Sequence, residues 1–173
     1  MNENDKPLDA ILGEEFLTWL WYQSDTAPGA FRDRDGKDFH VYMERNIVVQ
    51  GGEGDSLETA SVSGSLSPLR EARFGLGTGK KVVRAVIRLE KDDLAFQFSM
   101  KAADFSFNSL KTPKLDTGDK DDDPDALFLE KIFLMETATN LFNDLYASFL
   151  KLRLAPQWDQ EVRDMGRWLA RTE

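Results

Sequence analysis

Residues 81–100 read KVVRAVIRLEKDDLAFQFSM, two runs of alternating apolar residues separated by a short charged segment. A period of two places the apolar members of each run on one face of a β-strand. The segment Lys91-Asp92-Asp93 between the runs is short enough for a tight turn. The stretch therefore predicts an antiparallel hairpin with one buried face. Its apolar members are Val83, Ala85, Ile87, Leu89, Leu94, Phe96, Phe98 and Met100.

Weaker strand patterns lie on both sides of this hairpin. The break at residues 44–46 predicts a second hairpin, because alternation stops there and an apolar run follows. Together the patterns predict an antiparallel sheet of about five or six strands. The further strand segments are 39–43, 47–49, 57–63 and a short one containing Phe105 and Phe107.

Helical periodicity predicts four helices. The first, over about residues 13–24, is apolar nearly all round, so most of its surface is expected to be buried. A short helix opens at Ser67-Pro68, with the serine as N-cap. A long helix runs from Pro124 to about Leu154 with Asp123 as its N-cap, and a short amphipathic helix ends the chain.

The order of these elements predicts one α+β domain over residues 1–173, with a long C-terminal helix and a short apolar N-terminal helix packed on the sheet. Residues 1–10 are expected to form a polar segment that precedes the first helix. Residues 25–37 are expected to form a loop, and residues 111–123 a charged linker.

Composition limits the classes of function. The chain has no cysteine, which excludes disulfides, thiolate nucleophiles and cysteine metal sites. No run reaches the roughly 18 apolar residues of a membrane helix, and the polar N-terminus does not resemble a signal peptide. A soluble cytoplasmic protein is expected. The net charge of −9 has the wrong sign for a general nucleic-acid binder, although a local basic patch still binds phosphate.

Three patterns suggest catalysis or ligand binding and each has a simpler interpretation. The glycines before Lys80 lack the spacing of a phosphate loop and suit a helix end. The acidic run over 119–130 has Pro124 where a calcium loop needs glycine. His40 is the only histidine and has no nucleophile–base partners in the sequence. We therefore expect no enzyme, no metal site and no cofactor.

A basic island is the most suggestive feature. Seven cations and two anions between Arg70 and Lys91 give a local charge of +5. Alternation places Lys80, Arg84 and Arg88 on one face of the predicted strand. Two interpretations remain open: a solvated face whose cations pair with nearby acids, or a surface for phosphate contacts. The seven cations are Arg70, Arg73, Lys80, Lys81, Arg84, Arg88 and Lys91.

Several segments together resemble the C-terminal half of the recombination-associated RdgC family. They are residues 79–89, their hairpin partner 94–100, the stretch 105–111 and the helix over 125–152, with a further counterpart for residues 16–23. The resemblance extends over about 140 residues in order, but no signature motif accompanies it.

The resemblance implies a non-catalytic, nucleoid-associated protein. RdgC proteins form ring-shaped homodimers that encircle duplex DNA without sequence preference and restrain recombinase filaments. The N-terminal half of the family, which helps to build the ring, is expected to be missing, and the strand over 58–63 carries no cations. A protein-interaction module without DNA binding is the alternative, suggested by the aromatic segment 19–22. The positions that match the cations lining the ring are Lys80, Lys81, Arg84 and Arg88, with Arg70 and Arg73 on the preceding helix.

Overall fold

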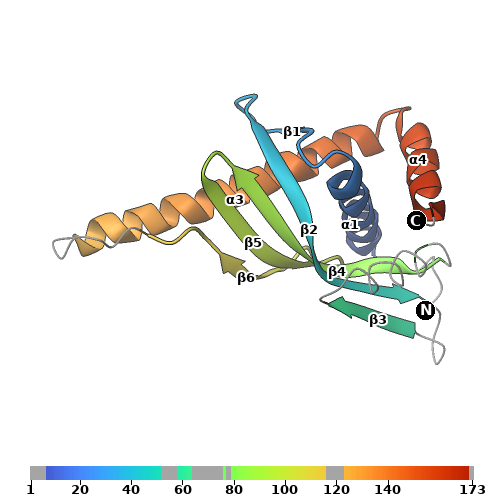
Figure 1. The fold of residues 1–173 in the computed structure, drawn as a ribbon, viewed down its shortest axis with the longest axis horizontal. Helices are drawn as coiled ribbons and strands as arrows, with labels where there is room; N and C mark the ends of the chain where they lie inside the picture. Colours follow the sequence, from blue (N-terminus) through green and yellow to red (C-terminus); the bar gives the residue numbers. More distant parts are fainter. Residues whose placement is uncertain (1–6, 52–57, 64–75, 77–78, 116–122, 172–173) are drawn as a thin grey trace.

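The computed structural model describes residues 7–51, 58–63, 76, 79–115 and 123–171. It confirms an α+β fold with a six-stranded antiparallel sheet of order β1-β2-β4-β5-β6, in which β3 pairs with β2 (Figure 1). The helices are α1 (Leu8–Thr26), α3 (Pro124–Arg153) and α4 (Trp158–Ala170). The strands are β1 (Phe31–Arg32), β2 (Asp38–Gly51), β3 (Glu58–Ser63), β4 (Lys81–Lys91), β5 (Leu94–Lys101) and β6 (Phe107–Lys111).

The predicted hairpin of residues 81–100 is confirmed as β4 and β5. Lys91 pairs with Leu94 across a two-residue turn, and Asp92 adopts a φ of 52° there. Ile87 lies opposite Phe98, and both side chains are buried in the core. The alternation of apolar residues therefore sets which face of this hairpin packs inward.

The second predicted hairpin is wrong, because β2 runs without a turn from Asp38 to Gly51. Both halves of β2 pair with β4, and the register shifts between Met43 and Ile47. Residues 44–46 contain no glycine or proline to reverse the chain, so an irregularity in the ladder absorbs the break in alternation.

Alternation along β4 also changes at an irregularity. Val48 pairs with Arg84, but the next residue, Val49, pairs with Val82. The extra residue in β4 shifts the phase of the strand, so Val82 is fully buried and Val83 only partly. The prediction that Val83 belongs to the buried face is therefore wrong, because Val82 takes that place. Lys80 lies before the strand and outside its alternation.

Other boundaries differ less. α1 begins at Leu8, so the polar leader is shorter than predicted, and Ala10 is already buried. Phe105 precedes β6 with a φ of 55°, and the two-residue strand β1 interrupts the predicted loop over 25–37. The predicted helix at Ser67-Pro68 and most of the charged linker lie outside the described residues.

α1 packs between the inner face of the sheet and α3. Phe16 of α1 is fully buried and meets the rings of Phe142, Tyr146 and Phe149 at centroid distances of 5.2–5.7 Å. Trp19 and Trp21 are buried as well, so the aromatic segment of α1 forms core in this chain. This burial removes the reason for considering that segment an interaction surface.

The predicted cap of α3 is confirmed. The side chain of Asp123 accepts a hydrogen bond from the amide of Asp125 at 3.0 Å, and Pro124 occupies the first helical turn. The C-terminal half of α3 is in the core through residues such as Leu145 and Phe149. Figure 1 shows the N-terminal part of α3 extending past the edge of the sheet.

Candidate nucleic-acid interface

The two faces of the sheet differ in burial and chemistry. One face carries buried apolar side chains, which pack against α1 and α3. The opposite face, called the outer face below, carries mostly polar side chains, which are exposed or half-buried apart from the buried Ser99. Its described members on β2, β4, β5 and β6 include Tyr42, Glu44, Val48, Gln50, Lys81, Arg84, Arg88, Glu90, Gln97, Ser99, Lys101 and Lys111.

Arg84 and Lys101 lie directly opposite each other on β4 and β5. Both are exposed, and the Nε of Arg84 donates a hydrogen bond to the hydroxyl of Ser99 at 3.0 Å. Among the described residues, no carboxylate lies within ion-pair distance of either cation. Like charges at directly opposed positions destabilise a sheet, so a bound anion would relieve this repulsion.

Two more lysines extend the positive charge of the outer face. Lys81 lies at one end of β4, opposite Gln50 of β2. Lys111 of β6 lies opposite Gln97 of β5. Both lysines are exposed. Among its described side chains, the outer face therefore presents four accessible cations on three neighbouring strands, at positions that the pleat directs away from the core.

Arg88 behaves differently from these cations. Its guanidinium lies 3.0 Å from Glu90 and 3.4 Å from Glu44, and it stacks over the ring of Tyr42 at 4.9 Å. The contact of its Nε with Glu44 is an ion pair without hydrogen-bond geometry. Two carboxylates neutralise this cation. Arg88 therefore fits the first interpretation, a cation on a solvated face that pairs with nearby acids. The sequence alone does not indicate Glu44 as a partner of Arg88, because Glu44 lies 44 residues earlier on another strand.

The remaining described cation predicted to contact DNA, Lys80, does not lie on the outer face. Lys80 is half-buried, and its side chain covers Gly51, where an added Cβ would lie 2.8 Å from the lysine Cγ. Lys80 also lines a cavity of about 450 Å³ between α1 and α4, and Lys81 borders the same cavity because it begins β4, although its strand position places it on the outer face. Arg70 and Arg73 lie outside the described residues.

Sequence reasoning missed Lys101 and Lys111. Both end strands of the predicted sheet, and Lys101 follows the alternation of 94–100 onto the polar face. That alternation could have identified Lys101. Lys111 could not be assigned in the same way, because Ser109 adopts a φ of 58° and the register shifts within β6.

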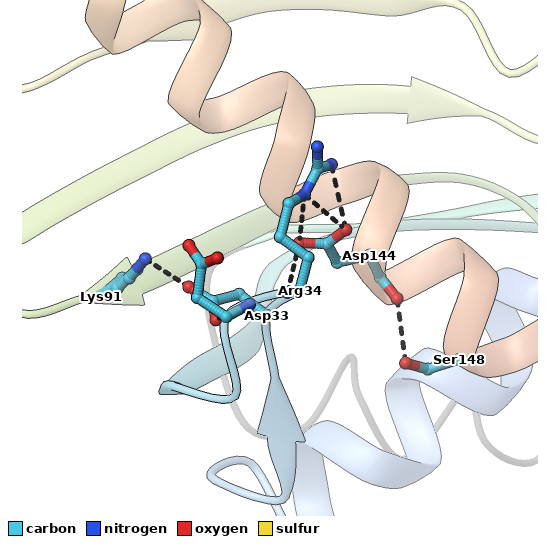
Figure 2. Close-up of polar contacts among 6 residues, drawn as sticks. Asp33, Arg34, Lys91, Asp144 and Ser148 are labelled. Atoms are coloured by element: carbon cyan, nitrogen blue, oxygen red, sulfur yellow. Dashed lines mark hydrogen bonds and ion pairs between the residues drawn. The ribbon is translucent and has the colours of Figure 1, made fainter.

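Lys91, the last cation of the basic island, belongs to a structural contact (Figure 2). Its ammonium forms an ion pair with Asp33, whose side chain is only 4% exposed. The other carboxylate oxygen of Asp33 accepts the amides of Asp35 and Lys37 at 2.9 Å. Beside it, Arg34 pairs with Asp144 of α3 at 3.1 Å. These contacts tie the β1–β2 loop to the β4–β5 hairpin and to α3.

The Asp33–Lys91 ion pair predicts a specific pH dependence of stability. The hydrogen bond from Lys91 holds the pKa of Asp33 below its usual value, and the same bond raises the pKa of Lys91. Stability from Asp33 is therefore present above its unfolded pKa of about 4 and is lost as the pH falls through the lowered folded pKa. Stability from Lys91 is present below about pH 10.4 and is lost above its raised folded pKa.

We expect Asp33→Asn to lower the free energy of unfolding by about 1.5–3 kcal/mol at neutral pH, because the amide keeps the acceptor for the loop but loses the charge that pairs with Lys91. Urea unfolding of both proteins at about pH 7 and pH 2.5 checks this. The difference should shrink at the lower pH, because Asp33 of the unfolded wild-type chain takes up a proton below its ordinary pKa of about 4, whereas the lowered pKa resists protonation in the folded state. An equal difference at both pH values would contradict the ion-pair explanation.

The structure also locates His40. Its ring stacks on Tyr42 with a centroid distance of 6.2 Å, and it lies close to Gly29. Among the described residues, no group of three or more histidine or acidic side chains is arranged to hold a metal ion. The described part of the chain contains no helix long and apolar enough to cross a membrane.

Comparison with known proteins found no match: no protein-family model, no curated protein and no solved structure matches the chain. The resemblance to the RdgC family therefore stays a prediction. A functional proposal has to rest on the charges and geometry of the outer face.

Proposed function

We propose that the protein binds duplex DNA through the phosphates, without sequence preference and without catalysis, and modulates recombination as a nucleoid-associated homodimer. The main support is the opposed pair Arg84 and Lys101, flanked by Lys81 and Lys111 on a face that no described helix covers. Neither Arg84 nor Lys101 forms an ion pair with a described carboxylate, so both remain available for phosphate contacts. The role in recombination, the nucleoid location and the dimer follow from the resemblance to RdgC proteins.

The side chains of the outer face favour backbone contacts over base readout. Among its described residues, the one tyrosine, Tyr42, is occupied by Arg88 on one face, so stacking of bases on this sheet has little support. Three lysines and Arg84 on the outer face contact phosphates, and such contacts carry no sequence information. The affinity should therefore be uniform across DNA sequences.

Fluorescence anisotropy with labelled duplexes tests this proposal. For about four phosphate contacts, we expect the affinity to fall roughly 100-fold between about 50 and 200 mM salt. Two duplexes of unrelated sequence should give the same affinity at each salt concentration. Equal affinity at both ionic strengths, or no binding at the lower one, would contradict phosphate binding.

A protein-interaction module that has kept the fold without DNA binding is the second candidate. The exposed apolar side chains on the projecting part of α3 favour it, because large apolar patches mark contact sites for other molecules. The two candidates separate in the anisotropy experiment, since this second function predicts no binding of DNA at low salt.

A further inference from the structure

The N-terminal half of α3 is apolar on nearly all sides. Residues 127–135 read LFLEKIFLM. Leu134 faces the core at 5% exposure, whereas five large apolar side chains in and around this segment remain open to solvent. A soluble helix that is apolar all round is normally buried on all sides. The open side chains, called the α3 stripe below, are Phe128, Leu129, Ile132, Phe133 and Met135.

The exposure of the α3 stripe is large for a single chain. Its side chains are 63%, 64%, 43%, 59% and 46% exposed in that order. With roughly 200 Å² for each large side chain, the stripe leaves on the order of 500 Å² of apolar surface open. This is close to the largest apolar patch that a typical monomer tolerates, and such patches are usually functional.

We propose that the α3 stripe is the contact surface for a second copy of this chain, across a two-fold axis. Two stripes facing each other bury on the order of 1,000 Å², the lower bound for a specific interface. A two-fold contact needs a surface that complements itself, and an apolar stripe on a helix meets that need by helix-on-helix packing.

Charge also favours a second copy at this place. The chain carries −9 overall, so most of its surface repels an identical surface. The five side chains of the stripe are uncharged, although Glu130, Lys131 and Glu136 leave a charge of −1 on residues 127–136. Two stripes can therefore touch without placing like charges in direct contact. The stripe begins on the part of α3 that extends past the edge of the sheet (Figure 1) and reaches Phe133, which borders a hollow beside Leu94 of the β4–β5 hairpin.

This inference assigns a surface to the dimer in the proposed function, but it is tested without DNA and fails or succeeds separately from DNA binding. The experiment is sedimentation velocity of the full chain over a wide concentration range. We expect wild-type protein to sediment with twice the mass of one chain. Leu129→Glu/Ile132→Glu should weaken association at least about 100-fold, because four carboxylates would enter the apolar interface of the dimer.

The matched control is Leu8→Glu/Leu154→Glu, which replaces two side chains that are 68% and 83% exposed outside the stripe. It has the same charge as the stripe variant and should remain dimeric. Both variants should keep the wild-type circular dichroism spectrum, since all four side chains are exposed in the single chain. A monomeric wild-type protein, or a stripe variant that dimerises like wild type, would overturn the proposal.

A crosslinking experiment gives an independent readout. The chain has no cysteine, so Leu129→Cys introduces a single thiol in the stripe and Leu154→Cys a single thiol outside it. A short bismaleimide should link Leu129→Cys into covalent dimers in high yield and leave Leu154→Cys mostly monomeric. Equal yields from the two variants would contradict a contact at the stripe.

Discussion

Gly13→Ala is expected to lower the free energy of unfolding by about 3 kcal/mol or more, although the same change on an exposed helical surface is stabilising. Gly13 lies in α1 where the helix backbone meets the end of β5. An added Cβ would lie 2.0 Å from the carbonyl oxygen of Ala102 and 2.7 Å from its carbonyl carbon. Both atoms belong to backbone, so no side chain can rotate away and α1 must move off the sheet.

Movement of α1 lowers the stability of the fold because this helix contributes many side chains to the hydrophobic core. Phe16, Leu17 and Leu20 follow Gly13 on the same helix and are all fully buried. Lifting them even slightly opens space between α1, the sheet and α3, and cavities in a packed core are expensive. The loss of stability in Gly13→Ala therefore combines the local clash with looser packing along the helix.

Gly166→Ala is the matched control for this prediction. Gly166 lies within α4, and an added Cβ there meets nothing within 4 Å. The substitution should raise the free energy of unfolding by about 0.5–1 kcal/mol through helix propensity. Urea unfolding of the two variants beside wild type measures both effects. If Gly13→Ala raised the free energy of unfolding as Gly166→Ala does, α1 would not approach Ala102 as closely as described.

Arg84→Glu/Lys101→Glu is expected to lower the affinity for duplex DNA at least about 100-fold at low salt, because two phosphate contacts become repulsive. The plot of log affinity against log salt should also become flatter by about 2 or more. Fold stability should change little, since the two side chains are exposed and their mutual repulsion is exchanged for another like-charge pair. Anisotropy titrations at several salt concentrations measure both the affinity and the slope.

The control for charge reversal is Lys151→Glu/Arg163→Glu. Both residues are exposed on α3 and α4, away from the outer face, and the double change moves the net charge from −9 to −13, as in the test variant. General repulsion of DNA is therefore equal in the two proteins. If the control loses as much affinity as Arg84→Glu/Lys101→Glu, the binding surface does not lie on the outer face. A separate Arg88→Glu variant should have a smaller effect than Arg84→Glu, because two carboxylates already neutralise Arg88.

Local sequence patterns determined much of the architecture. The alternation in residues 81–100 predicted the β4–β5 hairpin, and the pair Asp123-Pro124 predicted the start of α3. The apolar character of α1 predicted its burial. Each of these features depends on residues a few positions apart, whose relative placement is set by the backbone geometry of one strand, turn or helix.

Only the tertiary structure decided which charges on the outer face remain available. The pairing of β2 with β4 brings Glu44 to Arg88, and the pairing of β4 with β5 brings Lys101 to Arg84. The irregularity near Val82 shifts the phase of β4, and the contact of Gly13 with Ala102 joins elements that are far apart in the chain. These features depend on register between strands and on packing between elements. Register and packing follow from the sum of many long-range contacts, and no local periodicity in the sequence records them.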